Sequence, residues 1–296
     1  MLFVPGDSER KQQKALGVQA DALILDLEDS VASSQRSIAH ALVRDLLLSK
    51  PNRAQQSLWV RVNSLSSGLL LEDLIAVFPG APDGLLLPKV SSPEQIVQVS
   101  HYLAALEARE SRAPGATKLI AIVTETPQGL LNLLQYPRIV VGEPLQRLTA
   151  LTWGMEDLSA ALGATRKVDD SGTPTFTIQL ARSLCLTAAA ALGVQAVDSV
   201  AANFRDAAAL EREIAAARRD GFSGKLAIHP DQVAAINSAF SPTESDLARA
   251  RRVVTAFAAS PEAGVLNLDG EMIDRPHLLQ ARRILAADQE RASGSM

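Results

Sequence analysis

Eight short hydrophobic runs recur along the chain, and a segment with a helical pattern follows each of them. The runs lie at 2–5, 21–29, 57–63, 84–90, 118–125, 148–154, 194–200 and 225–230. Their hydrophobicity is continuous rather than alternating, which is typical of parallel strands covered by helices. Eight such units in 296 residues predict an α/β fold, the TIM (β/α)8 barrel. A doubly wound open sheet is the alternative, and the lack of a G-x-G-x-x-G after any run disfavours it.

The segments between the runs predict helices at 93–109, 174–192 and 206–220. Two more helical stretches, at about 243–259 and 276–290, follow the eighth run and are joined by a segment that contains Pro and Gly. We therefore expect a barrel over 1–240 and a C-terminal helical extension over 241–296. The extension could pack beneath the barrel, cover its mouth as a lid, or reach a neighbouring subunit as an exchanged arm.

Composition excludes several classes of function. A formal net charge of −4 argues against a nucleic-acid partner, which would require a concentrated basic surface. No apolar run reaches the roughly 20 residues that span a bilayer, and no leader pattern is present, so we expect no membrane partner. The single cysteine, Cys185, lies in an apolar stretch and fits a reduced thiol in the cytoplasm.

Polar side chains close most of the predicted strands, where a barrel of this kind carries its chemistry. Glu125 and Asp157 close adjacent strands and could share one ion. Oxygen ligands favour Mg²⁺, whereas four scattered histidines and one cysteine offer no convincing zinc site. The alternative is that each acid pairs with a basic side chain or a backbone amide. The polar residues at the strand ends are Glu28, Asp29, Arg61, Asn63, Lys89, Glu125, Glu156, Asp157, Asp198 and His229.

Basic residues near these acids suggest how an anionic substrate would be held. The planar fork of Arg61 suits bidentate recognition of a keto-acid or hydroxy-acid carboxylate, although a buried ion pair with Glu28 or Asp29 is the structural alternative. A Schiff base on Lys89 is a mechanistic rival, but neighbouring carboxylates would keep that amine protonated. Arg10 and Lys14, with Lys11, could contact phosphates or form a solvated helix face.

Nine segments resemble the citrate lyase beta-subunit family of the aldolase/citrate lyase superfamily, including its stand-alone members that act on citramalyl-CoA or malyl-CoA. The resemblance covers almost the whole chain in unbroken order. The segments are LFVPG at 2–6, LDLEDSV at 25–31, VRVNSLSSG at 60–68, LPKV at 87–90, ETPQG at 125–129, GMEDL at 154–158, FRD at 204–206, GFSGKLAIHP at 221–230 and GEMIDRP at 270–276.

The resemblance implies a Mg²⁺-dependent barrel that handles CoA thioesters and assembles as a homotrimer or as a hexamer of two trimers. Glu125 and Asp157 would bind the metal, and Arg61 would hold the keto acid. Asp274 would be a catalytic acid/base supplied by a neighbouring subunit. The remaining residues implied by the resemblance are Glu28, Asp29, Met155 and Glu156 at the substrate, and Phe3, Arg10 and Lys14 at CoA.

The activity we expect is carbon–carbon cleavage of citryl-CoA, citramalyl-CoA or malyl-CoA to acetyl-CoA and a keto acid such as oxaloacetate, pyruvate or glyoxylate. Three alternatives stay open. One is a malyl-CoA thioesterase that uses water on the same scaffold. Another is a keto-acid-binding subunit of a citrate lyase complex. The last is a class II aldolase that acts on free keto acids without CoA.

Overall fold

The computed structural model describes residues 1–139, 146–170 and 172–294. The chain divides into two compact units, Met1–Ile236 and Asn237–Met296. Each unit is described by itself below.

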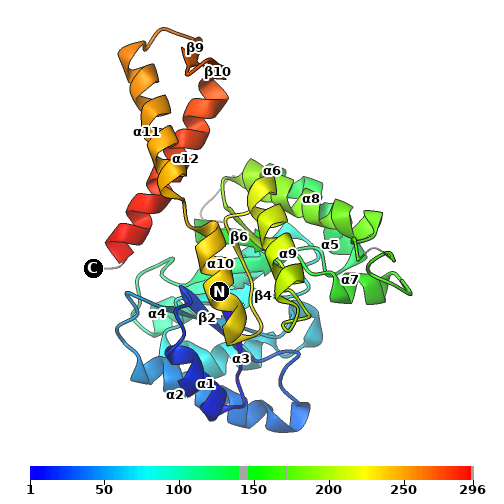
Figure 1. Ribbon diagram of the computed structural model, residues 1–296. Coiled ribbons are helices and arrows are strands. Elements are labelled where there is room, and N and C mark those ends of the chain that lie inside the picture. Colours follow the sequence, from blue (N-terminus) through cyan, green and yellow to red (C-terminus); the bar gives the residue numbers. More distant parts are fainter. Residues whose placement is uncertain (140–145, 171, 295–296) are drawn as a thin grey trace. The chain divides into compact units, whose positions relative to one another are not determined.

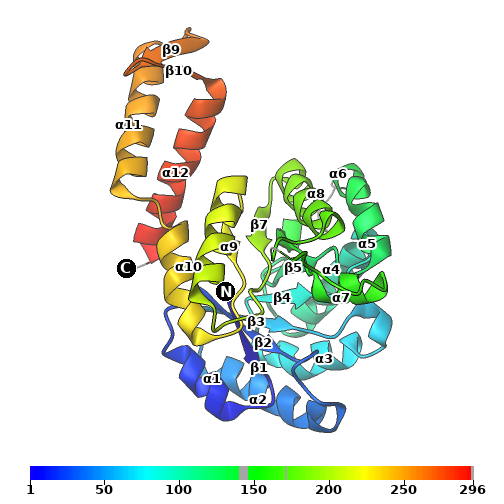
Figure 2. The ribbon, with the colours of Figure 1, turned by 45° about the vertical axis from the view of Figure 1, so that its right-hand side comes forward.

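Eight parallel strands form the centre of the first unit, in the same order along the sheet as along the chain. The sheet closes where the segment after the eighth strand meets the first: the Phe3 amide donates to the Ala227 carbonyl and the Ala227 amide to the Met1 carbonyl, both at 2.8 Å. The predicted TIM-type barrel is thus confirmed (Figures 1 and 2). The strands are β1 Leu2–Pro5, β2 Ala22–Asp26, β3 Ser57–Arg61, β4 Gly84–Leu87, β5 Lys118–Ile122, β6 Leu148–Thr152, β7 Gln195–Asp198 and β8 Gly224–Lys225.

Helices of this unit surround the strands, as Figure 2 shows. The three helices predicted at 93–109, 174–192 and 206–220 are confirmed as α4 Pro93–Arg109, α8 Phe176–Leu192 and α9 Ala207–Asp220. The others are α1 Glu9–Leu16, α2 Arg36–Ser49, α3 Leu70–Val77, α5 Pro127–Asn132, α6 Tyr136–Ile139, α7 Glu156–Ala161 and α10 Val233–Phe240, which crosses into the second unit. Short 3-10 turns occur at Ser33–Gln35, Leu65–Ser67, Phe78–Gly80, Leu133–Gln135 and Pro230–Gln232.

The interior of the barrel is a packed hydrophobic core and not a channel. Ile24 of β2, Ile120 of β5 and Leu226, which directly follows β8, belong to one buried cluster against which the Trp59 ring packs. The ring fits because position 84 on the neighbouring strand is glycine: a Cβ atom there would lie 2.2 Å from Cζ3 of Trp59. This core fills the inside of the barrel, and polar side chains lie at the carboxyl ends of the strands.

The second unit is a pair of helices with a β-hairpin between them. The helices α11 Glu244–Ala259 and α12 Arg275–Gly294 confirm the two helical stretches expected there. The hairpin, β9 Val265–Leu268 and β10 Glu271–Asp274, occupies the segment that we predicted only as a Pro- and Gly-containing connection. Asp269 and Gly270 turn it with φ of +54° and +86°, which matches the preference of tight hairpin turns for Asp-Gly.

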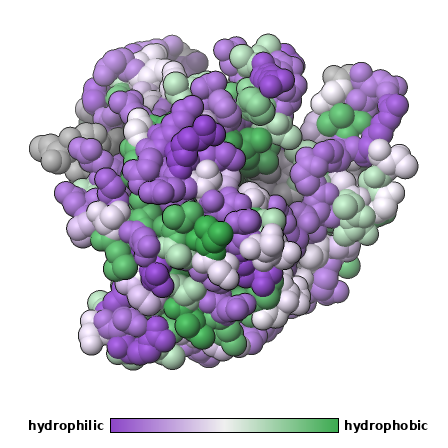
Figure 3. Space-filling model, turned by 90° about the horizontal axis from the view of Figure 1, so that it is seen from below, coloured by the Kyte–Doolittle hydropathy of each residue, from purple (hydrophilic) through white to green (hydrophobic). Residues whose placement is uncertain are grey.

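The outer surface of the first unit carries several exposed aliphatic side chains among polar ones. On α2 and α3 these are Ile38, Leu48, Leu71 and Ile75. Figure 3 views the molecule from below, the side of Figure 1 on which α2 lies, and shows hydrophobic areas interspersed with hydrophilic ones. None of the helices within the described ranges has the length and apolar character needed to cross a membrane.

Candidate active site

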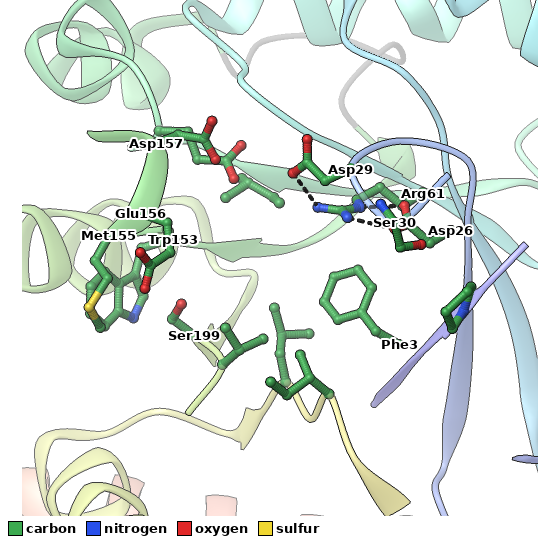
Figure 4. A pocket seen from close by; sticks show the side chains of 17 residues that line it. Phe3, Asp26, Asp29, Ser30, Arg61, Trp153, Met155, Glu156, Asp157 and Ser199 are labelled. Carbon is green, nitrogen blue, oxygen red and sulfur yellow. Dashed lines mark hydrogen bonds and ion pairs between the residues drawn. The ribbon is translucent and has the colours of Figure 1, made fainter. Parts of the chain in front are cut away.

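A cavity of about 310 Å³ opens at the carboxyl ends of the strands of the first unit. Its walls combine acidic, basic and apolar side chains that lie in or directly after seven of the eight strands, all except β4 (Figure 4). The lining residues are Phe3, Pro5, Asp26, Asp29, Ser30, Arg61, Ile122, Glu125, Trp153, Gly154, Met155, Glu156, Asp157, Ser199, Val200, Leu226 and Ile228.

Arg61 lies at the end of β3 with its guanidinium bound to Asp26, its register partner on β2. Nε and Nη2 donate to the two oxygens of Asp26, both at 2.7 Å. Nη1 lies 3.0 Å from Glu28 and 3.4 Å from Asp29, and the Phe3 ring covers the guanidinium at 4.8 Å. The Arg61–Asp26 pair is buried and bidentate, so it fixes Arg61 in place. The remaining nitrogen, Nη1, faces the carboxylates of Glu28 and Asp29.

The charge state of this pair follows from its packing. Burial opposes ionisation of Asp26, but the hydrogen bonds and positive charge of Arg61 outweigh it, so the pKa of Asp26 lies below its ordinary value. Burial likewise opposes the charge on Arg61, and the Asp26 carboxylate reverses the effect and raises the pKa of Arg61. Both groups are therefore ionised at neutral pH.

Lys89 follows β4 and places its ammonium among three carboxylates. Nζ lies 2.5 Å from Glu28 and 3.5 Å from both Asp29 and Asp157. Its backbone has φ of +52°, a left-handed conformation that a lysine rarely adopts. Burial lowers the pKa of Lys89, but the hydrogen bond to Glu28 outweighs it and the pKa is raised. The amine stays protonated, which removes the nucleophile that the Schiff-base alternative requires.

Glu125 lies three residues after β5 and is buried, with 6% of its surface exposed. One oxygen accepts the backbone N–H of Lys89 at 2.6 Å. Gly154 gives the side chain its room, because a Cβ atom at position 154 would lie 2.8 Å from Cγ of Glu125. Burial raises the pKa of Glu125 to about 8, and the carboxylates of Glu28 and Asp157 add to the shift. The site therefore holds a carboxyl group that a cation would ionise.

The other predicted metal ligand, Asp157, lies in the first turn of α7 just after β6, with Met155 and Glu156 beside it. Glu156 pairs with Lys167 and also lines the cavity. Within the described part of the chain, no three His, Cys, Asp or Glu side chains stand together as a preformed metal cluster. The ammonium of Lys89, in contact with Asp157, already neutralises part of the acidic group.

The donor set at this edge nevertheless fits Mg²⁺. Glu125 and Asp157 line the same cavity and supply oxygen atoms only, and the hollow beside Gly154 keeps the Glu125 carboxylate free of a covering side chain. Two carboxylates completed by water and substrate oxygens are the usual environment of this ion. The lining residues within the described ranges include no cysteine or histidine, which disfavours zinc.

A second cavity, of about 470 Å³, adjoins β1 and the first turns of α1. Arg10, Lys11 and Lys14 line it together with His229, and Phe3 lines both cavities. The structure thus brings the predicted CoA-binding residues Phe3, Arg10 and Lys14 to one place, next to the acidic cavity. All three basic residues are exposed, so they line a hollow that is open to solvent.

Asp274 lies in the second unit, as the last residue of β10. Its carboxylate is 2.5 Å from Nδ1 of His277, one turn into α12. The same ring nitrogen is 3.2 Å from the backbone nitrogen of Asp274. His277 therefore holds the Asp274 side chain at the start of α12.

Sequence reasoning missed one central residue and misplaced another. Asp26 was not singled out, although its register with Arg61 on adjacent strands could have indicated the pair. Asp198 was counted with the acids of the barrel mouth, and this was wrong. Its carboxylate accepts from the Trp153 indole and from Lys225, both at 2.8 Å, and so binds two buried partners instead of facing the cavity.

Comparisons with known proteins agree with this geometry. The chain is 35% identical over 95% of its length to citramalyl-CoA lyase, mitochondrial, of Homo sapiens, covering 83% of that protein. It is 33% identical over 97% of its length to citrate lyase subunit beta of Escherichia coli, covering 91% of it. Its fold matches the crystal structure of protein CitE of Mycobacterium tuberculosis with magnesium, acetoacetate and coenzyme A, at a TM-score of 0.74, 30% identity and 96% coverage of both chains.

The family assignment agrees with the resemblance seen in the nine sequence segments. A family model described as HpcH/HpaI aldolase/citrate lyase matches residues 1–230, which include every strand of the barrel. The order of the strands, the acidic cavity at their carboxyl ends and the relatives along nearly the whole chain all agree with that match. The chain belongs to the HpcH/HpaI aldolase/citrate lyase family.

Proposed function

We propose that this protein is a Mg²⁺-dependent carbon–carbon lyase that cleaves a hydroxyacyl-CoA thioester to acetyl-CoA and a keto acid. One observation carries the proposal: Glu125, Asp157 and Arg61 line one cavity at the carboxyl ends of the barrel strands. The relatives named above, which include a citramalyl-CoA lyase and a citrate lyase subunit, support the same reaction. The magnesium in the related CitE structure supports the metal.

In this proposal Glu125 and Asp157 hold Mg²⁺, which when bound makes the hydroxyl group of the substrate more acidic and orients its carboxylate. Arg61, fixed by Asp26, would contact the same carboxylate through Nη1, which lies 3.0 Å from Glu28 and would have to exchange that partner. Glu28 and Asp29 lie beside the metal position, and the backbone of Met155 and Glu156 lines the substrate. The residues proposed to contact CoA are Phe3, Arg10 and Lys14.

The reaction that these groups would carry out is a retro-Claisen cleavage. The hydroxyl proton passes to one of the carboxylates that line the cavity. The carbon that carried the hydroxyl group becomes the carbonyl carbon of the keto acid. The bond to the carbon next to the thioester breaks, and its electron pair forms the enolate of acetyl-CoA. Asp274, supplied by a neighbouring subunit, gives that carbon its proton, and His277 at 2.5 Å holds the carboxyl in place.

The proposal also includes the oligomeric state of the protein and its compartment in the cell. A homotrimer, or a hexamer of two trimers, would let residues 241–296 serve as a lid or exchanged arm that carries Asp274 to a neighbour. The exposed aliphatic residues on α2 and α3 would give such an assembly a surface to bury. The cytoplasm is the compartment that fits a chain with one buried, free cysteine.

The test is an incubation with citryl-CoA, citramalyl-CoA and malyl-CoA, with and without EDTA, followed by mass spectrometry of the products. Acetyl-CoA and a keto acid should appear together and disappear with EDTA. Glu125→Gln, Asp157→Asn and Asp274→Asn should each lose activity by at least about 100-fold, whereas the exposed control Glu72→Gln should not. Free CoA with malate would indicate a thioesterase instead, and no turnover would leave a binding subunit as the better account.

A further inference from the structure

Trp153 forms part of the cavity wall at the turn between β6 and α7. The residue is buried, with 4% of its surface exposed, and Figure 4 shows it across the cavity from Phe3. It directly follows β6 and precedes Gly154, the glycine against which the Glu125 side chain lies. Asp157 follows in the first turn of α7. The orientation of this one ring therefore bears on the position of both proposed metal ligands.

A buried carboxylate on the neighbouring strand holds the indole of Trp153. Nε1 donates to Oδ1 of Asp198 at 2.8 Å, and Asp198, the last residue of β7, is 2% exposed. The same carboxylate accepts from Nζ of Lys225 at 2.8 Å and from Nε of Arg182 at 3.3 Å. Donors from three different parts of the chain thus fix its direction. A hydrogen bond to a carboxylate is stronger than one to a neutral acceptor, so the indole is firmly oriented.

The two cations that bind Asp198 each have a second acidic partner on α9. Nζ of Lys225 lies 3.2 Å from Glu213. Nη1 of Arg182 lies 2.5 Å from Asp220. The ion pair of Asp198 with Lys225 could serve the barrel alone, because the two are register partners on β7 and β8. Such a pair does not require an indole N–H to point at the carboxylate, so a purely structural role leaves that hydrogen bond unexplained.

The backbone next to Trp153 shapes the space around Glu125. The Gly154 amide donates to Oγ1 of Thr124 at 3.1 Å, and a Cβ atom at position 154 would lie 3.0 Å from Oε1 of Glu125. Because packed groups this close transmit small displacements, a rotation of the Trp153 ring that shifted Gly154 would move the Glu125 carboxyl as well.

From these contacts we infer that Asp198 is a positioning residue for the metal site. Through the Trp153 indole it fixes the β6–α7 turn, which carries Asp157 and borders Glu125. The inference rests on the proposed function and adds to it a residue that acts on the metal ligands from behind the cavity wall. Partners of this kind, which orient ligands without being ligands, commonly change metal affinity or activity by about 10- to 100-fold when they are removed.

The experiment compares two substitutions of the same kind. Trp153→Phe keeps an aromatic ring but removes the N–H that Asp198 accepts. It should weaken Mg²⁺ binding, measured by calorimetry, and lower kcat for the thioester that is cleaved fastest, each by about tenfold or more. Trp59→Phe is the matched control, because that indole packs on the barrel core and donates to Ser57 at 3.1 Å. It should change neither value. A loss of Tm common to both variants cannot explain a loss of Mg²⁺ affinity in only one.

A double-mutant cycle tests whether Asp198 acts through the indole. Asp198→Asn should also weaken Mg²⁺ binding, and adding it to Trp153→Phe should weaken binding by less than about twofold more. Fluorotryptophan gives a spectroscopic check, since the chain has 2 tryptophans. The fluorine NMR resonance of Trp153 should move when Mg²⁺ is added to the wild type, and should move less in Asp198→Asn. If Asp198→Asn does not fold, the comparison of Trp153→Phe with Trp59→Phe still decides.

The outcomes separate this inference from the proposed function. If thioesters are cleaved and Trp153→Phe binds Mg²⁺ like the wild type, the inference is overturned and the lyase stands. Effects of the two substitutions that multiply would mean that Asp198 acts independently of the indole, which also overturns it. If no thioester is cleaved while Trp153→Phe alone weakens Mg²⁺ binding, the lyase is removed and the inference stands. If the wild type does not bind Mg²⁺, both are wrong.

Discussion

Metal binding to this protein should release a proton, because the carboxyl of Glu125 has a pKa of about 8 before a cation arrives. At pH 7 only about one tenth of such a group is ionised. The apparent affinity for Mg²⁺ should therefore rise about tenfold from pH 6 to 7, about fivefold from pH 7 to 8, and less than twofold beyond. About 0.9 proton should leave per ion bound at pH 7.

The same shift predicts how the stability of the metal-free protein depends on pH. The folded-state pKa of Glu125 lies above its ordinary value of 4.5, so the folded chain holds an extra proton between the two values. Stability should fall as pH rises from about 4.5 to 8, by at most roughly 5 kcal/mol, which is about 3.5 units at 1.36 kcal/mol each. Saturating Mg²⁺ should reverse most of that loss.

Calorimetry in two buffers of different ionisation enthalpy measures the released protons, and thermal unfolding with and without Mg²⁺ measures the stability. Glu125→Gln should bind Mg²⁺ weakly and without this dependence on pH, whereas Glu72→Gln, an exposed acid on α3, should behave as the wild type. An affinity that stays constant between pH 6 and 8 would refute the reasoning, since it would mean that the buried carboxyl is already ionised.

Three further substitutions or treatments test individual contacts. Asp26→Asn removes the charge that fixes Arg61 and should raise KM for the thioester at least about tenfold, measured by steady-state kinetics; an unchanged KM would show that Arg61 needs no such support. Gly154→Ala crowds Glu125 and should weaken Mg²⁺ binding at least about tenfold by calorimetry, and wild-type affinity would contradict that crowding. Borohydride added with keto acid should leave Lys89 unmodified in mass spectra, because the amine is protonated; an adduct would revive the Schiff-base route.

The barrel could be predicted from the sequence because its strands are buried on both faces and so appear as continuous hydrophobic runs. The helices after the eighth strand could be predicted for a related reason, as their apolar residues recur at helical spacing. The hairpin at Val265–Asp274 was missed because its strands are short and mostly exposed, which leaves little pattern. Its Asp-Gly turn was the available signal.

The site was predictable only in part. Residues that close a strand, such as Glu125 and Asp157, can be identified from strand order alone. Contacts that depend on side-chain direction cannot: Asp198 closes β7 yet turns to Lys225, and Asp26 was hidden inside a hydrophobic run. The roles of these residues in catalysis remain predictions that the variants above address.

The closure of the barrel has a consequence for its dynamics. Between β1 and the segment after β8, two backbone hydrogen bonds at Phe3 and Ala227 and one from the Met1 ammonium to the Lys225 carbonyl hold the join, and β7 and β8 pair over two residues, whereas β2 and β3 pair over five. Local opening should therefore begin on this side of the barrel, at a free energy below that of global unfolding. Phe3 forms a wall of both cavities, so each opening event would merge the basic hollow with the acidic one. A molecule bound across both would hold the join shut, and the slowing of amide exchange at Phe3 would report its occupancy.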